Sequence, residues 1–270
     1  MKERNRNKTQ IMGILNVTPD SFSDGGKYDS TESAVLRAKE MIQEGADIID
    51  IGGESTRPNA PIVSTEDELK RVISVIEKIK SFVSNISIDT SKSEVAQKAI
   101  EAGATIVNDI YGLQNDKDMA QVVAKNNVKI IIMHIKGTPE NMQNNPEYKN
   151  VIDEINDYFQ KSISIAESAG INREEIVLDP GIGFGKTVKD NLDIIKNIRK
   201  LAKFEIPIML GVSRKSFIGK ITGAEVENRL AGSIASITIG IMNGVDIVRV
   251  HDVKETKQAV EIIDRIIGKE

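Results

Sequence analysis

The chain has 270 residues, of which 40% are hydrophobic and 28% charged, a net charge of −4 and no cysteine. This composition is that of an ordinary globular protein and excludes a disulfide framework. The acidic balance argues against nucleic acid as the main partner, because sequence-independent binding depends on a basic face. The N-terminus MKERNRNK has no apolar segment behind it, and the longest apolar stretch, IASITIGIM, is about half a membrane span. We therefore expect a cytoplasmic protein that binds neither nucleic acid nor membranes.

Eight short runs rich in isoleucine and valine are spaced along the chain, and each is typical of a buried strand. In chain order they cover residues 9–17, 46–53, 85–90, 105–110, 128–135, 175–181, 207–213 and 246–252. The segments between them, such as TESAVLRAKEMIQEGA at 31–46, carry apolar residues at spacings of three and four and a glycine near the end, where a helix terminates. The pattern predicts strands that alternate with helices.

The strand-and-helix unit recurs within the chain. EGADIIDIGG, EAGATIVNDI and NGVDIVRVHD each pass from a glycine at the end of a helix into a buried strand with a polar end. Strict alternation predicts parallel strands joined by right-handed crossovers. Eight such units, with neither a linker nor a low-complexity tract between them, favour an α/β TIM (β/α)8 barrel over an open sheet. We expect residues 1–270 to form this single domain.

Chemistry in such a barrel lies at the carboxyl ends of the strands, whatever the reaction. The residues predicted at those ends are mostly polar and carry charges of both signs. They are Asn16, Glu54 to Arg57, Asp89, Asn108, Met133, His134, Asp179, Arg214 to Ser216, Arg249 and His251. A ring of this kind is typical of a small-molecule pocket, so we expect the active site there.

Alternation along the strands predicts that several of these polar side chains share the inward face of the barrel. An isolated ion costs several kcal/mol to desolvate, so charges on that face need partners. A purely structural interpretation is therefore an ion network in which Asp89 and Asp179 pair with Lys215 and Arg249. For any single residue this interpretation is at least as good as a functional one, whereas the whole ring favours a pocket.

Eight segments together resemble the motifs of the dihydropteroate synthases, the pterin-binding enzymes of folate biosynthesis. They are MGILNVTPDSFSDGG, IDIGGESTRPN, ISIDTSK, IVNDI, LDPGIGFGK, GVSRKSFIG, NRLAGSIA and VRVHDV, in the family's order from residue 12 to residue 253. GIGFGK alone is a weak signal, since it lacks the lysine and serine spacing of a Walker A motif. The resemblance implies that p-aminobenzoate displaces pyrophosphate from 6-hydroxymethyl-7,8-dihydropterin pyrophosphate to give 7,8-dihydropteroate.

The resemblance assigns six residues to the pterin ring: Asp89, Asn108, Met133, Asp179, Phe184 and Lys215. The pterin's amino-pyrimidinone edge is rich in N–H donors, which carboxylates and a side-chain carbonyl accept well. The lysine is implied to donate to a ring acceptor. The methionine and phenylalanine are implied to line the faces of the ring, and core filling is a close alternative for these two.

The resemblance assigns Asn16, Arg249 and His251 to the pyrophosphate, with Asn16 also near a metal ion. The planar fork of arginine suits phosphate oxygens. Since the sequence holds no dense carboxylate cluster, a metal bound mainly by substrate oxygens is implied, and this suits Mg²⁺. The structural alternative is that Arg249 is a partner of Asp179 inside the barrel and that His251 is a satisfied core histidine.

The segments NVTPDSFSDGG and ESTRPN resemble the family's mobile substrate loops. Six residues are assigned to these loops and to the benzoate: Phe22, Asp24, Thr56, Arg57, Pro58 and Ser216. The phenylalanine and the proline are implied to form an apolar wall, the threonine and the arginine to fasten the loops over pyrophosphate, and the aspartate to lie near the developing positive charge. The serine is implied to lie near the benzoate carboxylate, and a plain helix N-cap is its structural alternative.

The mechanism that we expect is a dissociative displacement. An aromatic amine is unprotonated at neutral pH, so strong base catalysis is unnecessary, and the chain offers no cysteine nucleophile. Mg²⁺, Arg249 and His251 would stabilise the departing pyrophosphate while the pterin spreads the charge. Asp24, Arg57 and Lys215 complete the expected catalytic set.

Two other functions stay open from the sequence. A pterin-binding methyltransferase domain shares the fold and the pterin contacts, but lacks the combined NVTPDSFSDGG and SRKSFIG motifs. A non-catalytic pterin-binding protein would be expected to lose loop or anion-binding residues first, and these are present. Consumption of p-aminobenzoate discriminates among the three. The resemblance also implies a homodimer, and Lys136 stands where the family often has arginine or glutamine.

Overall fold

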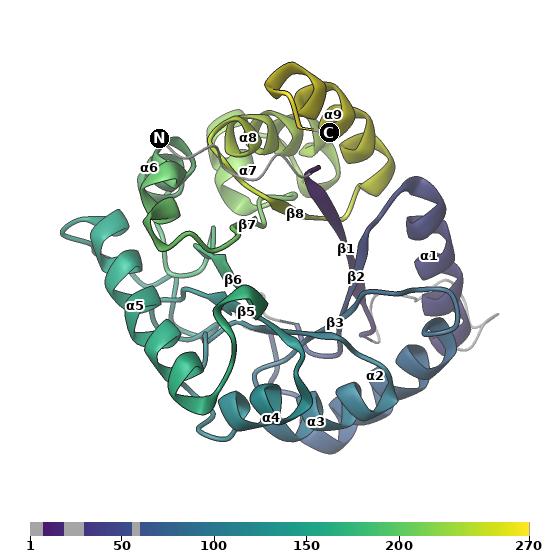
Figure 1. Ribbon diagram of the computed structural model, residues 1–270. Helices are drawn as coiled ribbons and strands as arrows, with labels where there is room; N and C mark the ends of the chain where they lie inside the picture. The colour runs from purple at the N-terminus through teal and green to yellow at the C-terminus, as the bar shows by residue number, and fades with distance from the viewer. Residues whose placement is uncertain (1–7, 19–29, 56–59, 270) are drawn as a thin grey trace.

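The computed structural model describes residues 8–18, 30–55 and 60–269, and in this part of the chain parallel strands alternate with helices around a barrel (Figure 1). The strands are β1 (Gln10–Asn16), β2 (Ile48–Gly52), β3 (Ile86–Asp89), β4 (Ile106–Asp109), β5 (Lys129–Met133), β6 (Ile176–Asp179), β7 (Met209–Leu210) and β8 (Ile247–Val250). All eight coincide with the predicted runs. The prediction of a TIM barrel is therefore confirmed.

The sheet closes on itself through its two outer strands. Hydrogen-bonded neighbours follow the order β6-β5-β4-β3-β2-β1-β8-β7, with every pair parallel. A single parallel bridge between Leu178 and Ile208 brings β6 beside β7, and the N–H of Leu178 donates to the carbonyl oxygen of Pro207 at 2.9 Å. The carboxyl ends of all the strands consequently meet at one rim.

The helices form an outer ring around the strands (Figure 1). They are α1 (Ser30–Glu44), α2 (Thr65–Ile79), α3 (Ser93–Ala102), α4 (Met119–Asn126), α5 (Val151–Ala169), α6 (Val188–Asn197), α7 (Ser216–Thr222), α8 (Leu230–Met242) and α9 (Val253–Ile267). The last helix packs beside the first, so the ring of helices also closes. In the described residues, none of these helices has the length and apolar character that crossing a membrane requires.

Local sequence explains where a helix such as α2 begins and which face it buries. Ser64 is its N-cap and accepts a hydrogen bond from the backbone N–H of Asp67 at 3.1 Å, which satisfies one free donor of the first turn. Val72, Ile76 and Ile79 recur at spacings of four and three and are fully buried. Each such side chain contributes about 1.5–3 kcal/mol by leaving water, so this face holds the helix against the barrel.

The interior of the barrel has an apolar layer and, above it, a polar one. The apolar layer is a separate cluster of buried residues: Met12, Ile48, Ile106, Ile131, Val177, Met209 and Ile247. Side chains two residues apart on a strand share a face, so the next inward positions toward the rim are polar on several strands. The apolar layer thus closes the floor of the barrel and confines polar chemistry to the rim.

Candidate active site at the strand ends

A small pocket lies at the rim formed by the carboxyl ends of the strands. Its lining residues come from β3, β4, β5, β6 and β8 and from the segments that follow β4, β6 and β7. They are Asp89, Asn108, Ile110, Met133, Asp179, Ile182, Phe184, Gly211, Lys215 and Arg249. All six residues predicted to surround a pterin ring are thus brought to one pocket, together with Arg249.

Arg249 is the centre of an ion network at the floor of this pocket. Its Nε lies 2.6 Å from Oδ2 of Asp50, and a terminal guanidinium nitrogen lies 2.6 Å from Oδ2 of Asp89. Asn108 also donates to Oδ2 of Asp50, at 3.2 Å. The fork of arginine can hold two carboxylates in fixed directions. The network therefore fixes the relative orientation of the guanidinium of Arg249, the carboxylate of Asp89 and the amide of Asn108.

Asp50 is a member of this network that the sequence interpretation missed. The predicted ion network paired Asp89 and Asp179 with Lys215 and Arg249. The structure has the pair of Arg249 with Asp89, and the second partner of Arg249 is Asp50. Asp50 lies in the middle of β2 and is fully buried. The available signal was a carboxylate two residues after Ile48 on the inward face of a strand. Asp50 is not at the end of its strand, so the prediction of site residues from strand ends did not include it.

Burial is the main influence on the ionisation of Asp89 and Asp179, the two aspartates that line the pocket. Burial raises the pKa of Asp89 to about 7 against the attraction of Arg249, and the charge of Asp50 adds to the rise. Burial likewise raises the pKa of Asp179, opposed by a hydrogen bond from the backbone N–H of Gly181 at 2.8 Å. Both carboxylates are therefore poised to gain from partners that donate N–H groups.

Lys215 and Phe184 face each other across the pocket. The ammonium of Lys215 lies 4.2 Å from the centre of the Phe184 ring, within cation–π range. Gly211 leaves space beside them, since an added Cβ there would lie 3.9 Å from Cβ of Arg249 and 4.0 Å from Oδ2 of Asp179.

Asn16 lies at the end of β1, near the polar floor. An added Cβ on Gly52 would lie 3.8 Å from Oδ1 of Asn16 and 3.7 Å from Cβ of Asp89, so Gly52 separates these two side chains without filling the space. Asn16 is half-buried. Its amide oxygen thus lies near the same rim as the pocket.

His251 is oriented by Ser213. The Nδ1 atom of His251 lies 3.0 Å from Oγ of Ser213, and the same Oγ accepts the backbone N–H of His251 at 3.2 Å. The hydroxyl of Ser213 can donate its proton to Nδ1, and in that arrangement the imidazole proton lies on Nε2. Burial lowers the pKa of His251 to about 4, and the charges of Arg249 and Arg214 add to this. His251 is therefore a neutral N–H donor at neutral pH.

We expect neither histidine to titrate between about pH 5.5 and 8. The chain has two histidines, and burial lowers the pKa of His134 well below its usual value, as it does for His251. The measurement is the chemical shift of the imidazole carbons by ¹H–¹³C NMR across this range. The urea-unfolded protein, titrating near pH 6.5, is the control. A folded-state midpoint near 6.5 for His251 would contradict the burial argument.

Two residues of the segment after β7 lie at the rim as predicted, with one difference. Ser216 is exposed and is the first residue of α7, while Lys215 is the N-cap. The alternative role of Ser216 as an N-cap is therefore wrong. Arg214 is held by Asp252 through two hydrogen bonds of 3.0 and 2.5 Å. Ser216, which is exposed, therefore directly follows Lys215, the lysine that lines the pocket.

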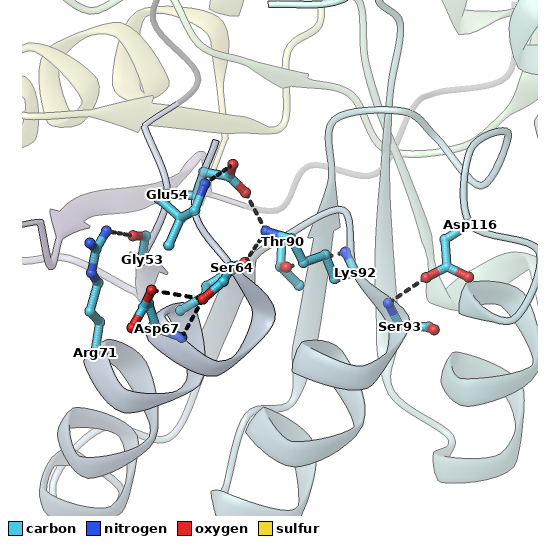
Figure 2. Close-up of polar contacts among 11 residues, drawn as sticks. Gly53, Glu54, Ser64, Asp67, Arg71, Thr90, Lys92, Ser93 and Asp116 are labelled. Carbon is cyan, nitrogen blue, oxygen red and sulfur yellow. Dashed lines mark hydrogen bonds and ion pairs between the residues drawn. The ribbon is translucent and has the colours of Figure 1, made fainter. Parts of the chain in front are cut away.

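The carboxylate of Glu54 joins the two ends of the segment that follows β2. Glu54 accepts the N–H of Val63 at 3.0 Å with Oε1 and the ammonium of Lys92 at 2.5 Å with Oε2 (Figure 2). Lys92 also pairs at 2.5 Å with Glu68, which is fully buried. Glu54 thereby joins the beginning and end of the segment 54–63. Sequence analysis located Glu54 at the rim but did not identify Lys92.

Five residues predicted for the substrate loops lie outside the described part of the chain. They are Phe22, Asp24, Thr56, Arg57 and Pro58. Their roles stay predictions.

Comparison with known proteins agrees with the composition of the pocket. The model of the family described as "Pterin binding enzyme" matches residues 12–251. The dihydropteroate synthase of Clostridium beijerinckii is 50% identical over 264 residues, covering 97% of this chain and 96% of that protein. The structure of the Clostridium difficile dihydropteroate synthase, determined in the presence of pteroic acid, matches with a TM-score of 0.92 and 47% identity over 100% of both chains. The Xanthomonas albilineans dihydropteroate synthase with 4-aminobenzoic acid matches with a TM-score of 0.92 and 39% identity, covering 97% of this chain and 94% of that one. The chain therefore belongs to the pterin-binding enzyme family and, within it, to the dihydropteroate synthases.

Proposed function

We propose that the protein condenses 6-hydroxymethyl-7,8-dihydropterin pyrophosphate with p-aminobenzoate to give 7,8-dihydropteroate and pyrophosphate. The carbon–oxygen bond to pyrophosphate breaks, the bond from the methylene carbon to the aromatic nitrogen forms, and the nitrogen loses a proton. The observation that carries the proposal is a pocket lined by Asp89, Asn108 and Asp179 together with Lys215 and Arg249, in a chain of this family.

The pterin ring is proposed to bind in the pocket with its amino-pyrimidinone edge toward the two aspartates and Asn108. The carboxylates and the amide oxygen accept the N–H groups of that edge, and hydrogen bonds to charged groups contribute about 1.5–3 kcal/mol each. Lys215 donates to a ring acceptor. Met133 and Phe184, both buried at the pocket wall, are proposed to contact the two faces of the ring.

The pyrophosphate is proposed to lie toward Arg249 and the N–H of Nε2 on His251. Because His251 is neutral, it contributes a hydrogen bond and Arg249 contributes the charge. Among the residues that the structure describes, no three histidine, aspartate or glutamate side chains are grouped so as to hold a metal ion. A single amide oxygen from Asn16 fits Mg²⁺ that takes its other ligands from the substrate and water. Such an ion would neutralise charge on the leaving group.

The benzoate is proposed to bind outside the pterin, near Ser216 and the loop residues. Phe22 and Pro58 would supply an apolar wall, and Thr56 and Arg57 would act over the pyrophosphate. The support for Ser216 is its exposed position at the start of α7, next to Lys215. Asp24 is proposed to stabilise the positive charge that develops on the pterin.

The chain's own groups are proposed to act by position and electrostatics in a dissociative displacement. Arg249 is already fixed by Asp50 and Asp89, so it need not reorganise when negative charge develops on the departing oxygen. The carboxylates of the pocket lie where they can favour positive charge on the pterin. The amine of p-aminobenzoate then attacks the methylene carbon without a strong base.

We expect purified protein with both substrates and Mg²⁺ to release pyrophosphate and dihydropteroate in equal amounts. Lys215→Ala should reduce both products at least a hundredfold, because it removes the donor to the pterin, and chelation of Mg²⁺ should stop both until Mg²⁺ is returned. The two products are followed together by a coupled pyrophosphate assay and chromatography.

The two other functions give different results in this assay. Pyrophosphate without dihydropteroate would mean that the benzoate site is misplaced. A methyltransferase domain would leave p-aminobenzoate unconsumed, and a non-catalytic binding protein would hold pterin without forming either product.

A homodimer in the cytoplasm is also proposed. Ala231, Ala235, Ile239 and Met242 recur at spacings of four, four and three along α8 and are exposed, Ile239 at 47% and Met242 at 48%. Leu192 on the neighbouring α6 is exposed at 45%. An apolar stripe of this kind is typical of a helix that packs against another surface.

We expect the protein to sediment at twice the 29.7 kDa mass of one chain. The double substitution Ile239→Asp and Met242→Asp should shift it to one chain's mass, because buried charges would disfavour the interface. Analytical ultracentrifugation makes the measurement. Ile266→Asp, on α9 and 73% exposed, is the matched control that should leave the dimer intact. Wild-type protein at the mass of one chain would contradict the proposal.

A further inference from the structure

Lys186, at the end of the segment after β6, is a buried lysine that the reaction does not use. It is 4% exposed. Its ammonium is bonded to the carbonyl oxygen of Phe184 at 2.9 Å, Nδ1 of His134 at 3.0 Å and the carbonyl oxygen of His134 at 3.4 Å. Three N–H donors thus meet three acceptors. No carboxylate of the described residues forms an ion pair with it.

The acceptors of Lys186 belong to the two segments that form the walls of the pocket. His134 directly follows Met133, the pocket residue at the end of β5, and Phe184 is itself a pocket residue. One ammonium therefore holds the backbone behind both of the side chains proposed to contact the faces of the pterin. A shift of either segment would change the position of Met133 relative to Phe184, which belong to one buried apolar cluster.

The same two segments are in close backbone contact along the loop. Gly181 and Gly185 have φ values of +67° and +64°, which disfavour other residues. An added Cβ on Gly181 would collide with the carbonyl oxygen of His134, and one on Gly185 with that of Lys136. The backbone of residues 181–185 therefore packs directly against the segment after β5. The hydrogen bonds of Lys186 stabilise this contact.

Burying a lysine without a carboxylate partner costs free energy that an apolar side chain would avoid. Burial lowers the pKa of Lys186 to about 7, with Asp179 opposing the shift. Methionine or leucine would fill the space without this cost but would leave three acceptors unpaired. Burial of Lys186 therefore costs free energy, while its three hydrogen bonds fix the relative position of the two pocket walls.

We propose that Lys186 is a positioning residue for the pterin, because its ammonium joins the backbone of Phe184 to that of His134 and so sets the position of Phe184 relative to Met133. The inference rests on the proposed binding of the pterin in this pocket. Lys186 acts through these walls and does not contact the reacting atoms.

The positioning role depends on the protonated form of Lys186. Loss of one proton removes one of the three donors, so the contact between the walls weakens as pH rises through the pKa of Lys186. The charged and titratable groups that act on the ammonium are His134, Lys136, Asp179, Asp190 and Lys215. The contribution of Lys186 to pterin affinity is expected to fall above about pH 7. Because the pKa of Asp89 is also about 7, this contribution is measured as the difference between the pH profiles of the wild type and a Lys186 variant.

The test is Lys186→Met in the full-length protein, with the affinity for dihydropterin pyrophosphate measured by calorimetry and the KM for each substrate measured kinetically. We expect pterin binding to weaken about tenfold or more and the KM for p-aminobenzoate to stay within about twofold. Lys186→Met should also lose the weakening above pH 7. Lys80→Met is the matched control, because the ammonium of Lys80 also bonds a carbonyl oxygen, that of Ala102 at 3.0 Å, away from the pocket.

Unchanged pterin affinity in Lys186→Met, or an equal loss for both substrates, would overturn the inference. The variant Asp179→Asn distinguishes a failure of the Lys186 inference from a failure of the proposed pterin site. If Asp179→Asn weakens pterin binding and Lys186→Met does not, the Lys186 inference alone fails. If neither does, the pterin site itself is misplaced. Should Lys186→Met not fold, Lys186→Arg decides, because a guanidinium stays charged above pH 7: a pH dependence of pterin affinity equal to that of the wild type contradicts the inference.

Discussion

Replacement of Arg249 by leucine is expected to lower kcat about a thousandfold and to destabilise the fold by several kcal/mol. Arg249 is the cation proposed for the departing pyrophosphate, and a preorganised donor at developing charge accounts for factors of about 10²–10³. Its removal also leaves Asp50 and Asp89 without their guanidinium partner, and breaking a buried pair costs about 3–5 kcal/mol. Steady-state kinetics and urea unfolding measure the two effects.

Arg173→Leu is the matched control for this experiment. Arg173 pairs with Glu167 at 2.8 Å, but both side chains are nearly half exposed, at 46% and 47%, so we expect a loss of at most about 1 kcal/mol and no change in kcat. Arg249→Lys retains the charge without the planar fork and should be intermediate. A kcat of Arg249→Leu within tenfold of the wild type would contradict the role proposed for Arg249.

Replacement of Asp179 by asparagine is expected to weaken pterin binding about a hundredfold. The two side chains have nearly the same shape, but the amide presents N–H donors where the pterin edge also presents donors. A lost charge-assisted hydrogen bond and a buried unpaired group together account for about 3 kcal/mol. The measurement is the dissociation constant of dihydropterin pyrophosphate by calorimetry, with folding verified by circular dichroism.

Asp246→Asn is the control, because Asp246 also accepts a backbone N–H, that of Ile208 at 2.9 Å, but precedes β8 at the opposite end of the barrel. We expect it to leave pterin affinity unchanged. Equal weakening in both variants would indicate a general loss of structure, and no weakening in Asp179→Asn would remove this residue from the pterin site.

The strand-and-helix alternation and the order of the elements were predictable because they depend on local patterns. Runs such as IIDIG and KIIIM are β-branched and bounded by turn residues, and both are strands in the structure. The parallel arrangement follows from the helices between them. The rim location of Asp89, Asn108 and Asp179 follows from the same pattern, since each ends or nearly ends its strand.

Tertiary structure decided which charges pair. Asp50 and Arg249 are 199 positions apart in sequence, and they meet because β1 lies between β2 and β8 in a closed sheet. The sequence pattern places both on inward faces but contains no information on which cation reaches which carboxylate, because that depends on side-chain directions across the barrel. Asp179 was predicted as a partner of Arg249, but its recorded hydrogen bond is with the nearby Gly181.

The sequence by itself determined the fold class, the rim on which the polar groups gather and, through its motifs, the family. Only the tertiary structure decided the pairing of Arg249, the orientation of His251 by Ser213 and the burial of Lys186 between two loops. The physical reason is the range of the interactions: helix and strand periodicity involves neighbours within a few residues, whereas hydrogen-bond partners and burial are set by contacts between distant segments, which exist only once the barrel has closed.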